Sequence, residues 1–178
     1  MASDEQYVEF VRARTPALLR TARLLTAGDG QAAEDLVQTA VTHGFVKRGR
    51  IRDSGAIEAY VRRILVHAAV RRSRDRWRRH VELLEPAEPD SDSHGVGGVA
   101  DRLVVLGALR VLPPRQRAVV VLRYYDDLSE AQIAAALGCS RGAVKSHNSR
   151  ALKTLRRLLG PHFVPAPEST GQGRSHDA

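Results

Sequence analysis

The chain has 178 residues, and its 28 Lys and Arg side chains against 20 Asp and Glu give a formal net charge of +8. The single cysteine, Cys139, excludes an internal disulfide framework and a multi-cysteine zinc site. No apolar run approaches the roughly 18 residues of a membrane span, and the N-terminus lacks the apolar stretch of a secretory signal. We therefore expect a cytoplasmic protein without membrane insertion, whose positive charge suits a polyanionic partner.

The net charge is a cancellation between segments of opposite sign. Residues 1–80 carry 16 basic and 9 acidic side chains, or +7, and residues 102–160 carry 11 and 3, or +8. Residues 81–101 carry 6 acidic and no basic side chains, and residues 161–178 have a net charge of −1. Because Pro, Ser, Gly and acidic residues dominate 81–101, we predict a flexible acidic linker there and a disordered tail at 161–178.

Apolar residues in the first block recur with the period of an α-helix. The first helical face carries Tyr7, Val11, Leu18, Ala22 and Leu25. Pro16 interrupts this stripe, so we expect a new helix to start there with Thr15 as its N-cap. A second stripe carries Ala33, Leu36, Val37, Ala40 and Val41.

The third predicted helix, starting near Ser54, has an apolar face and a far end saturated with arginine. Its apolar face consists of Ile57, Tyr60, Val61, Ile64, Leu65 and Ala68. Eight arginines lie between positions 62 and 79. Compensation of the helix dipole needs only one or two cations, whereas arginine forks match phosphate oxygens and stack on bases. The helix therefore indicates nucleic-acid contact, with Tyr60 and Trp77 as possible stacking faces.

The second block contains a helix-turn-helix pattern. Ser129 and Gln132 have capping-box spacing, Gly138 suits a turn with positive φ, and Ser140 can cap the next helix. Ala134, Gly138 and Val144 then form the spacing skeleton of the motif. The outward face of the second helix carries side chains that reach base edges and phosphates in a major groove: Arg141, Lys145, Ser146, Ser149 and Arg150.

Motifs from both blocks match one family in order. They are Ala33–Gln38, Tyr60–Val66, Leu112–Arg117, Leu122–Tyr125, Ser140–Ser146 and Arg150–Leu152. Together they resemble the extracytoplasmic-function sigma factors of bacterial RNA polymerase, over roughly residues 5–160. The resemblance implies an all-α fold of two small helical domains, sigma region 2 (1–80) and the helix-turn-helix region 4 (102–160), joined by the flexible acidic linker (81–101).

The resemblance also implies partners and contact residues. The partners would be core RNA polymerase, through its β′ clamp helices and β flap, promoter DNA, and an anti-sigma factor. The β′ clamp contact would use Asp35, Leu36, Val37 and Gln38. The −10 strand would be held by Tyr60, Arg63, His67, Arg71, Arg72 and Arg74. The −35 duplex would be read by Lys145, Ser146, Ser149 and Arg150, with Arg141 on the backbone.

Four positions depart from the family pattern. Gln132 stands where a Glu is usual, which leaves the capping box intact. Tyr60 stands where members often have Trp, and His67 where they often have Asn. Asn148 occupies a position that is apolar in many members, so the recognition helix is expected to seat differently.

The sequence offers no catalytic constellation and no metal or cofactor site, since the histidines are scattered and no phosphate-loop motif occurs. We therefore expect a protein that is not an enzyme. The main alternative is a stand-alone helix-turn-helix regulator whose N-terminal block is a sensor or dimerisation domain. A second is an adaptor that binds polymerase without choosing promoters.

Overall fold

A computed structural model describes residues 4–51, 54–83 and 99–161 of the chain. Within these ranges the chain folds into helices without a strand, which confirms the predicted all-α class. The helices are α1 Asp4–Leu25, α2 Gly30–Lys47, the 3-10 turn η1 Arg48–Arg50, α3 Ser54–Leu83, α4 Val99–Val111, α5 Pro114–Tyr124, α6 Glu130–Leu137 and α7 Arg141–Leu159.

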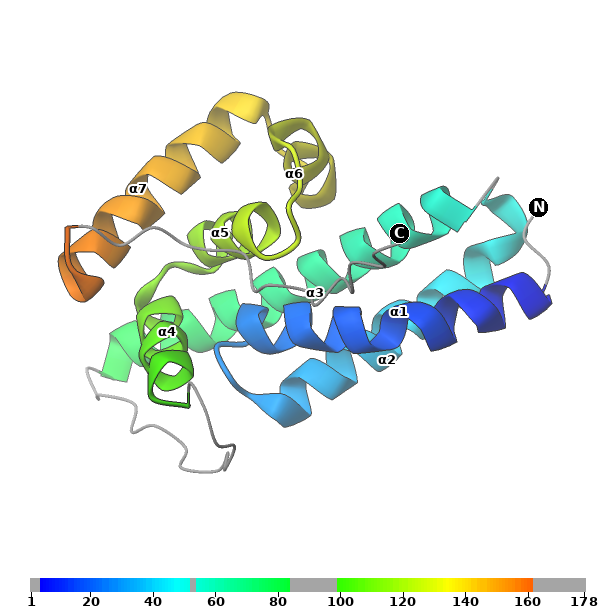
Figure 1. Cartoon of the computed structure of the whole chain (residues 1–178), viewed down its shortest axis with the longest axis horizontal. Coiled ribbons are helices and arrows are strands. Elements are labelled where there is room, and N and C mark those ends of the chain that lie inside the picture. The colour runs from blue at the N-terminus through cyan, green and yellow to red at the C-terminus, as the bar shows by residue number, and fades with distance from the viewer. Residues whose placement is uncertain (1–3, 52–53, 84–98, 162–178) are drawn as a thin grey trace, which may run out of the picture.

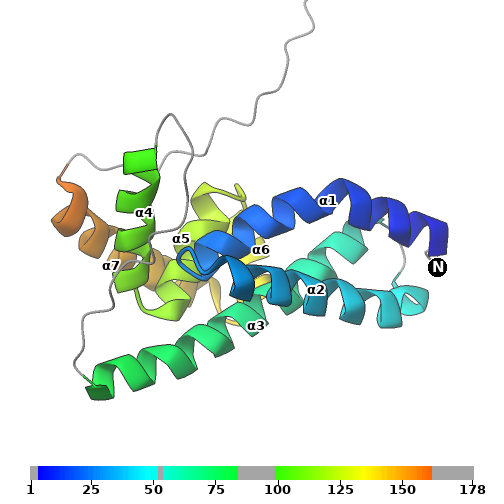
Figure 2. The ribbon, with the colours of Figure 1, turned by 90° about the horizontal axis from the view of Figure 1, so that it is seen from below.

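Helices α1, α2 and α3 pack side by side as an up-down-up bundle (Figures 1 and 2). The predicted apolar stripes face its interior, where Tyr7, Leu18 and Leu65 are buried. Asp29 caps α2, because its carboxylate accepts the Ala32 N–H at 2.9 Å. The bundle thus follows from helix periodicity and capping.

The expected break at Pro16 is wrong, since α1 is one helix from Asp4 to Leu25 with Pro16 inside it. Thr15 is not an N-cap: its hydroxyl donates to the Val11 carbonyl oxygen one turn back, at 2.6 Å. Burial of side chains on both sides of the proline, Phe10 and Leu18 among them, outweighs the lost backbone bond.

Helix α3 runs to Leu83 and α4 begins at Val99, so helical residues occupy both ends of the segment predicted as a linker, 81–101. Glu82 and Leu83 are good helix formers and extend α3 into the acidic segment. Most of the predicted linker, residues 84–98, and the predicted tail from residue 162 onward lie outside the described residues.

The C-terminal helices pack directly on the N-terminal bundle. Helix α5 contacts α1 and α3, and α6 contacts α3, so buried side chains from both blocks form one continuous core. Val66 and Ala69 on α3 are fully buried, although neither belongs to the predicted stripe. They lie four and seven residues after Arg62, which pairs with Asp126 in the loop after α5. These residues therefore form a second buried face of α3, toward the C-terminal helices.

Arg117 on α5 joins the two blocks through hydrogen bonds to backbone oxygens. Its guanidinium is buried and donates to the carbonyl oxygens of Leu109 (2.8 Å), Leu25 (3.1 Å), Arg110 (3.2 Å) and Leu112 (3.2 Å). Leu25 is the last residue of α1, and the others end α4 or follow it. Carbonyl groups at the C-terminal end of a helix lack intrahelical donors. The Arg117 side chain supplies donors to the C-terminal ends of both α1 and α4.

Candidate nucleic-acid interface

The helix-turn-helix prediction is confirmed in its local geometry. The Gln132 N–H donates to Ser129 Oγ at 3.2 Å, and the Ser129 N–H donates to Gln132 Oε1 at 2.8 Å, which completes the capping box of α6. Gly138 ends α6 with φ of 62°, in the left-handed region. Ser140 Oγ accepts the Ala143 N–H at 3.1 Å and starts α7. Val144 is fully buried against the preceding helices.

One face of α7 is open to solvent and carries polar and basic side chains. Arg141, Lys145, Ser146, Ser149 and Arg150 are all exposed. The opposite face holds Val144, Ala151 and Leu155, which are buried. The structure therefore presents the residues predicted to read duplex DNA together, on one face of a single helix.

Asn148 and His147 lie between these two faces, where both are half-buried. The Asn148 side chain donates to the Tyr124 hydroxyl at 3.3 Å, which ties α7 to the end of α5. His147 Nδ1 and Asn148 Oδ1 are buried without a hydrogen-bond partner in the described part of the chain. Burial, followed by the charges of Arg115 and Arg150, lowers the pKa of His147 and favours its neutral form. These two residues thus seat the recognition helix.

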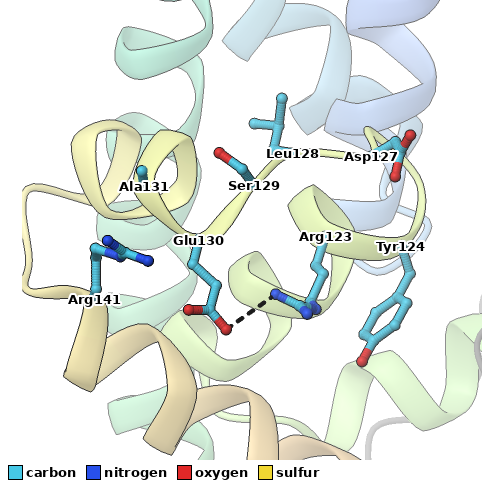
Figure 3. A pocket seen from close by; sticks show the side chains of 8 residues that line it. All are labelled: Arg123, Tyr124, Asp127, Leu128, Ser129, Glu130, Ala131 and Arg141. Carbon is cyan, nitrogen blue, oxygen red and sulfur yellow. Dashed lines mark hydrogen bonds and ion pairs between the residues drawn. The ribbon is translucent and has the colours of Figure 1, made fainter.

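An acidic side chain lies among the cations at the start of this face. Glu130 Oε1 is 3.4 Å from Arg123 Nη1 on α5, and Glu130 Oε2 is 3.8 Å from Lys145 Nζ on α7. Figure 3 shows Glu130 between Arg123 and Arg141, with the Arg123 pair as a dashed line. These side chains line an open hollow of about 650 Å³ between α5, α6 and α7.

Arginine side chains cover the exposed surface of α3. Arg63, Arg71, Arg72 and Arg74 are exposed, and Tyr60 is half-buried. Five of the predicted −10 residues are spaced three or four apart and therefore share one helix face: Tyr60, Arg63, His67, Arg71 and Arg74. Arg72 lies to one side of this face. His67 is exposed, yet its Cε1 lies only 3.6 Å from where a Cβ on Gly138 would stand. The turn of the helix-turn-helix therefore lies against the middle of this arginine-rich face.

Comparisons with known proteins decide the family. Residues 10–79 match the family model "Sigma-70 region 2", and residues 102–155 match "Sigma-70, region 4". The chain is 38% identical over 163 residues to the RNA polymerase sigma-E factor of Streptomyces coelicolor, covering 86% of each chain. It is 36% identical over 150 residues to the ECF RNA polymerase sigma factor SigM of Mycobacterium tuberculosis, covering 80% of this chain and 71% of SigM. The chain belongs to the extracytoplasmic-function sigma factors of the sigma-70 family.

The fold of this sigma factor also resembles a solved relative. The sigma factor RpoE of Bartonella quintana, solved in complex with the anti-sigma factor NepR, superimposes with a TM-score of 0.71 at 26% identity. The match covers 87% of this chain and 97% of RpoE.

Family membership settles the broad function. A sigma factor binds core RNA polymerase and promoter DNA, directs promoter-specific initiation and is a non-catalytic component of it. The alternative of a stand-alone regulator is wrong, because the block that would have been a sensor domain matches region 2. The alternative of an adaptor without promoter choice is also wrong, because sigma factors direct initiation at specific promoters.

The predicted polymerase-contact segment on α2 is only partly at the surface. Asp35 and Gln38 are exposed, and Asp35 accepts a hydrogen bond from Gln31 at 3.2 Å. Leu36 and Val37 are 6% and 5% exposed, so both are buried in this structure, as the apolar stripe predicted, and their contact with polymerase stays a prediction. Their side chains belong to the three-helix core, toward which the apolar stripe of α2 turns. Contact with polymerase by Asp35 and Gln38 stays a prediction.

The contacts between the two regions include residues that the sequence did not single out. The Thr21 hydroxyl on α1 donates to Asp126 Oδ1 at 2.6 Å, and Arg62 Nε lies 3.7 Å from Asp126 Oδ2. Arg62 also pairs with Glu58, which accepts a second bond from Arg14. Burial raises the pKa of the Asp126 carboxyl, although the Thr21 bond and the Arg62 charge oppose the shift. No residue spacing could have revealed this network, because Thr21 and Asp126, which share a hydrogen bond, lie 105 positions apart.

Among the described residues, no helix is long and apolar enough to cross a membrane. That part of the chain also lacks any group of three His, Cys, Asp or Glu side chains placed to hold a metal ion.

Proposed function

We propose that this sigma factor reads the −35 element as duplex through α7 and holds the −10 element as a single strand on α3. The observation that carries the proposal is the exposed face of α7 (Arg141, Lys145, Ser146, Ser149 and Arg150) on a capped helix-turn-helix. Lysine, arginine and serine on such a face are suited to base edges and phosphates in the major groove.

The arginine-rich face of α3 suits a melted strand better than a duplex. Tyr60 offers an aromatic surface on which a base can stack, and Arg63, Arg71 and Arg74 follow along one side of the helix. Arginine forks bind phosphate oxygens in two-point contacts and also stack on bases. His67, in the middle of this face, can donate a hydrogen bond to an unstacked base.

In this structure regions 2 and 4 are packed together, too close to each other to bind both promoter elements at once. Elements centred at −35 and −10 are about 85 Å apart along duplex DNA, at about 3.4 Å per base pair. In the structure, however, α6 packs on α3 and the Gly138 turn lies against His67. Regions 2 and 4 therefore separate when both elements are bound, and residues 81–101 span the gap between them.

Two further surfaces support docking by partner proteins in the cytoplasm. Asp35 and Gln38 on α2 are exposed, and we propose that they contact a β′ clamp helix. On α4, the side chains of Leu103, Val104 and Val111 are 49%, 55% and 46% exposed. Exposed apolar side chains gathered on one helix are typical of protein interfaces, and the β flap or an anti-sigma factor would cover them.

Reconstitution tests the whole proposal. The purified chain is mixed with core RNA polymerase, and promoters that the holoenzyme selects from a genomic library are sequenced and used in run-off transcription. We expect initiation at specific sites that share −35 and −10 motifs. Tight binding to duplex DNA by the chain alone, with no added initiation by core polymerase, would contradict it.

The first prediction concerns the exposed residues of α2. Asp35→Ala together with Gln38→Ala is expected to weaken binding to core polymerase about ten-fold, because the proposed contact with the clamp helix would lose both polar side chains. Their exposure predicts a free energy of unfolding within about 0.5 kcal/mol of wild type. A matched control is Gln6→Ala with Glu9→Ala, an exposed amide and an exposed acid three residues apart on α1. Equal core binding by both double variants, measured by fluorescence anisotropy, would remove α2 from the interface.

The second prediction concerns Arg150. Arg150→Ala is expected to lower initiation about ten-fold at a promoter with an intact −35 element, since one base-reading arginine contributes about 1–3 kcal/mol. With a scrambled −35 element the variant and the wild type should initiate at similar rates. An equal loss on both promoters would show that Arg150 contacts only the phosphate backbone.

A further inference from the structure

We propose that Glu130 is a positioning residue that makes region 4 selective for its −35 sequence over other duplex DNA, by holding Lys145 at the DNA-facing surface. The inference rests on the proposed reading of the −35 duplex through α7, to which it adds a residue.

The geometry of Glu130 links the three helices of the DNA-binding unit. Its carboxylate pairs with Arg123 on α5 at 3.4 Å and with Lys145 on α7 at 3.8 Å, while its own backbone begins α6. The Glu130 side chain is 23% exposed, whereas that of Lys145 is 67% exposed. An anchored carboxylate thus holds a mobile ammonium group. The capping box on Ser129 and Gln132 fixes the backbone from which Glu130 projects.

Glu130 also sets the charge of the hollow that it lines. Arg123 and Arg141 line the same hollow, together with the exposed carboxylate Asp127 (Figure 3). A carboxylate at this place repels DNA phosphates and partly neutralises the cations around it. Glu130 lies on the surface predicted to face DNA and is therefore expected to lower the affinity for DNA. Its contribution must be to something other than affinity.

That contribution is to selectivity. Phosphate contacts carry no sequence information, and they supply most of the affinity for non-specific DNA. Glu130 reduces this attraction on every sequence alike. At the correct sequence, the Lys145 ammonium, held in one region of space, has less conformational freedom to lose when it reaches a base edge. The acid thus weakens binding to wrong DNA more than binding to the −35 element.

The test uses the reconstituted holoenzyme and two promoter fragments that differ only in an intact or scrambled −35 element. We expect Glu130→Gln to strengthen binding to the scrambled fragment and to lower the intact-to-scrambled affinity ratio about two- to five-fold. On the scrambled fragment, the slope of log affinity against log salt should steepen by about 1, because a freed cation neutralises a phosphate. Glu9→Gln, the same change of charge at an exposed position of α1, should leave the ratio unchanged.

A double-mutant cycle with Lys145→Ala shows whether Glu130 acts through Lys145. We expect Glu130→Gln to lower the ratio in the wild-type background and to leave it unchanged in the Lys145→Ala background. An unchanged ratio in the wild-type background, or an equal fall in both backgrounds, would overturn the positioning role. If the wild-type holoenzyme itself binds both fragments equally, the −35 reading by region 4 has failed instead, which is a distinguishable result.

Discussion

We expect the replacement of Arg117 by methionine to lower the free energy of unfolding by about 3 kcal/mol. Methionine fills a similar volume but has no donor, so the carbonyl oxygens of Leu25, Leu109, Arg110 and Leu112 lose this partner. The Leu109 oxygen keeps the Leu112 N–H as a donor at 3.2 Å, whereas a buried acceptor left without a donor costs about 1–3 kcal/mol. Methionine carries no charge, so the cost of burying the guanidinium charge disappears in the variant and offsets part of the loss. The expected total therefore lies well below the summed cost of the lost hydrogen bonds.

The charge of Arg117 is itself unfavourable in the folded state. Burial, followed by the positive charges of Arg110 and Arg76, lowers the pKa of its guanidinium to about 10. A base whose pKa is lowered in the folded state makes that state less stable below the folded pKa, and this loss is relieved only as pH rises above about 10. At neutral pH the group is charged in both states, so the benefit comes from its hydrogen bonds to the helix ends.

Arg115 provides a matched control for this prediction. It lies on the same helix as Arg117 but is exposed, so Arg115→Met should change the free energy of unfolding by no more than about 0.5 kcal/mol. Urea titration followed by far-UV circular dichroism measures both variants. Similar stability of the two variants would show that the contacts of Arg117 with the end of α1 do not contribute to folding in solution.

Local patterns predicted the helix-turn-helix well, because its determinants are close in sequence. The capping bonds and the positive φ involve only residues three or four positions apart, namely Ser129, Gln132, Gly138 and Ser140. The exposed face of α7 follows from the same periodicity, since burial of Val144 fixes which side of the helix points outward.

Contacts across long sequence separations could not be predicted in the same way. Arg62 looked like one more surface arginine of α3, but Asp126 pairs with it from the other region. Leu36 and Val37 illustrate a different limit. Family resemblance placed them in an interface, and apolar periodicity placed them in the core, and the structure buries both. Burial depends on which helix packs where, which the pattern of one segment does not specify.

Gly44→Ala tests the packing that presents the α2 face to polymerase. Gly44 is buried where α2 crosses α1 and α3. A Cβ there would stand 2.7 Å from Val61 Cγ2 and closer still to the Tyr7 hydroxyl. That hydroxyl donates to the Val41 carbonyl oxygen at 2.6 Å, and both Tyr7 and Val61 are almost fully buried, so neither can move aside freely.

We expect the substitution to lower the free energy of unfolding by about 2 kcal/mol. Overpacking costs about 1–3 kcal/mol, and displacing Tyr7 costs a hydrogen bond of about 1 kcal/mol. The better helix propensity of alanine returns about 1 kcal/mol. Gly30→Ala, at the first residue of the same helix, has nothing within 4 Å of the added Cβ and should be neutral or stabilising by up to about 1 kcal/mol.

Combining Gly44→Ala with Tyr7→Phe shows whether the loss of stability comes from the clash between the new Cβ and the Tyr7 hydroxyl or from a general sensitivity of α2 to substitution. Phenylalanine lacks the oxygen nearest to the new methyl group, so the double variant should be more stable than the sum of the single losses predicts. Urea titration measures the stabilities, and anisotropy with labelled core polymerase measures the consequence. Because Asp35 and Gln38 lie on the same helix, Gly44→Ala should weaken core binding and Tyr7→Phe should restore part of it. Additive losses of stability, or a Gly44→Ala variant as stable as Gly30→Ala, would mean that α2 is not held in register by the contact between Gly44 and Tyr7.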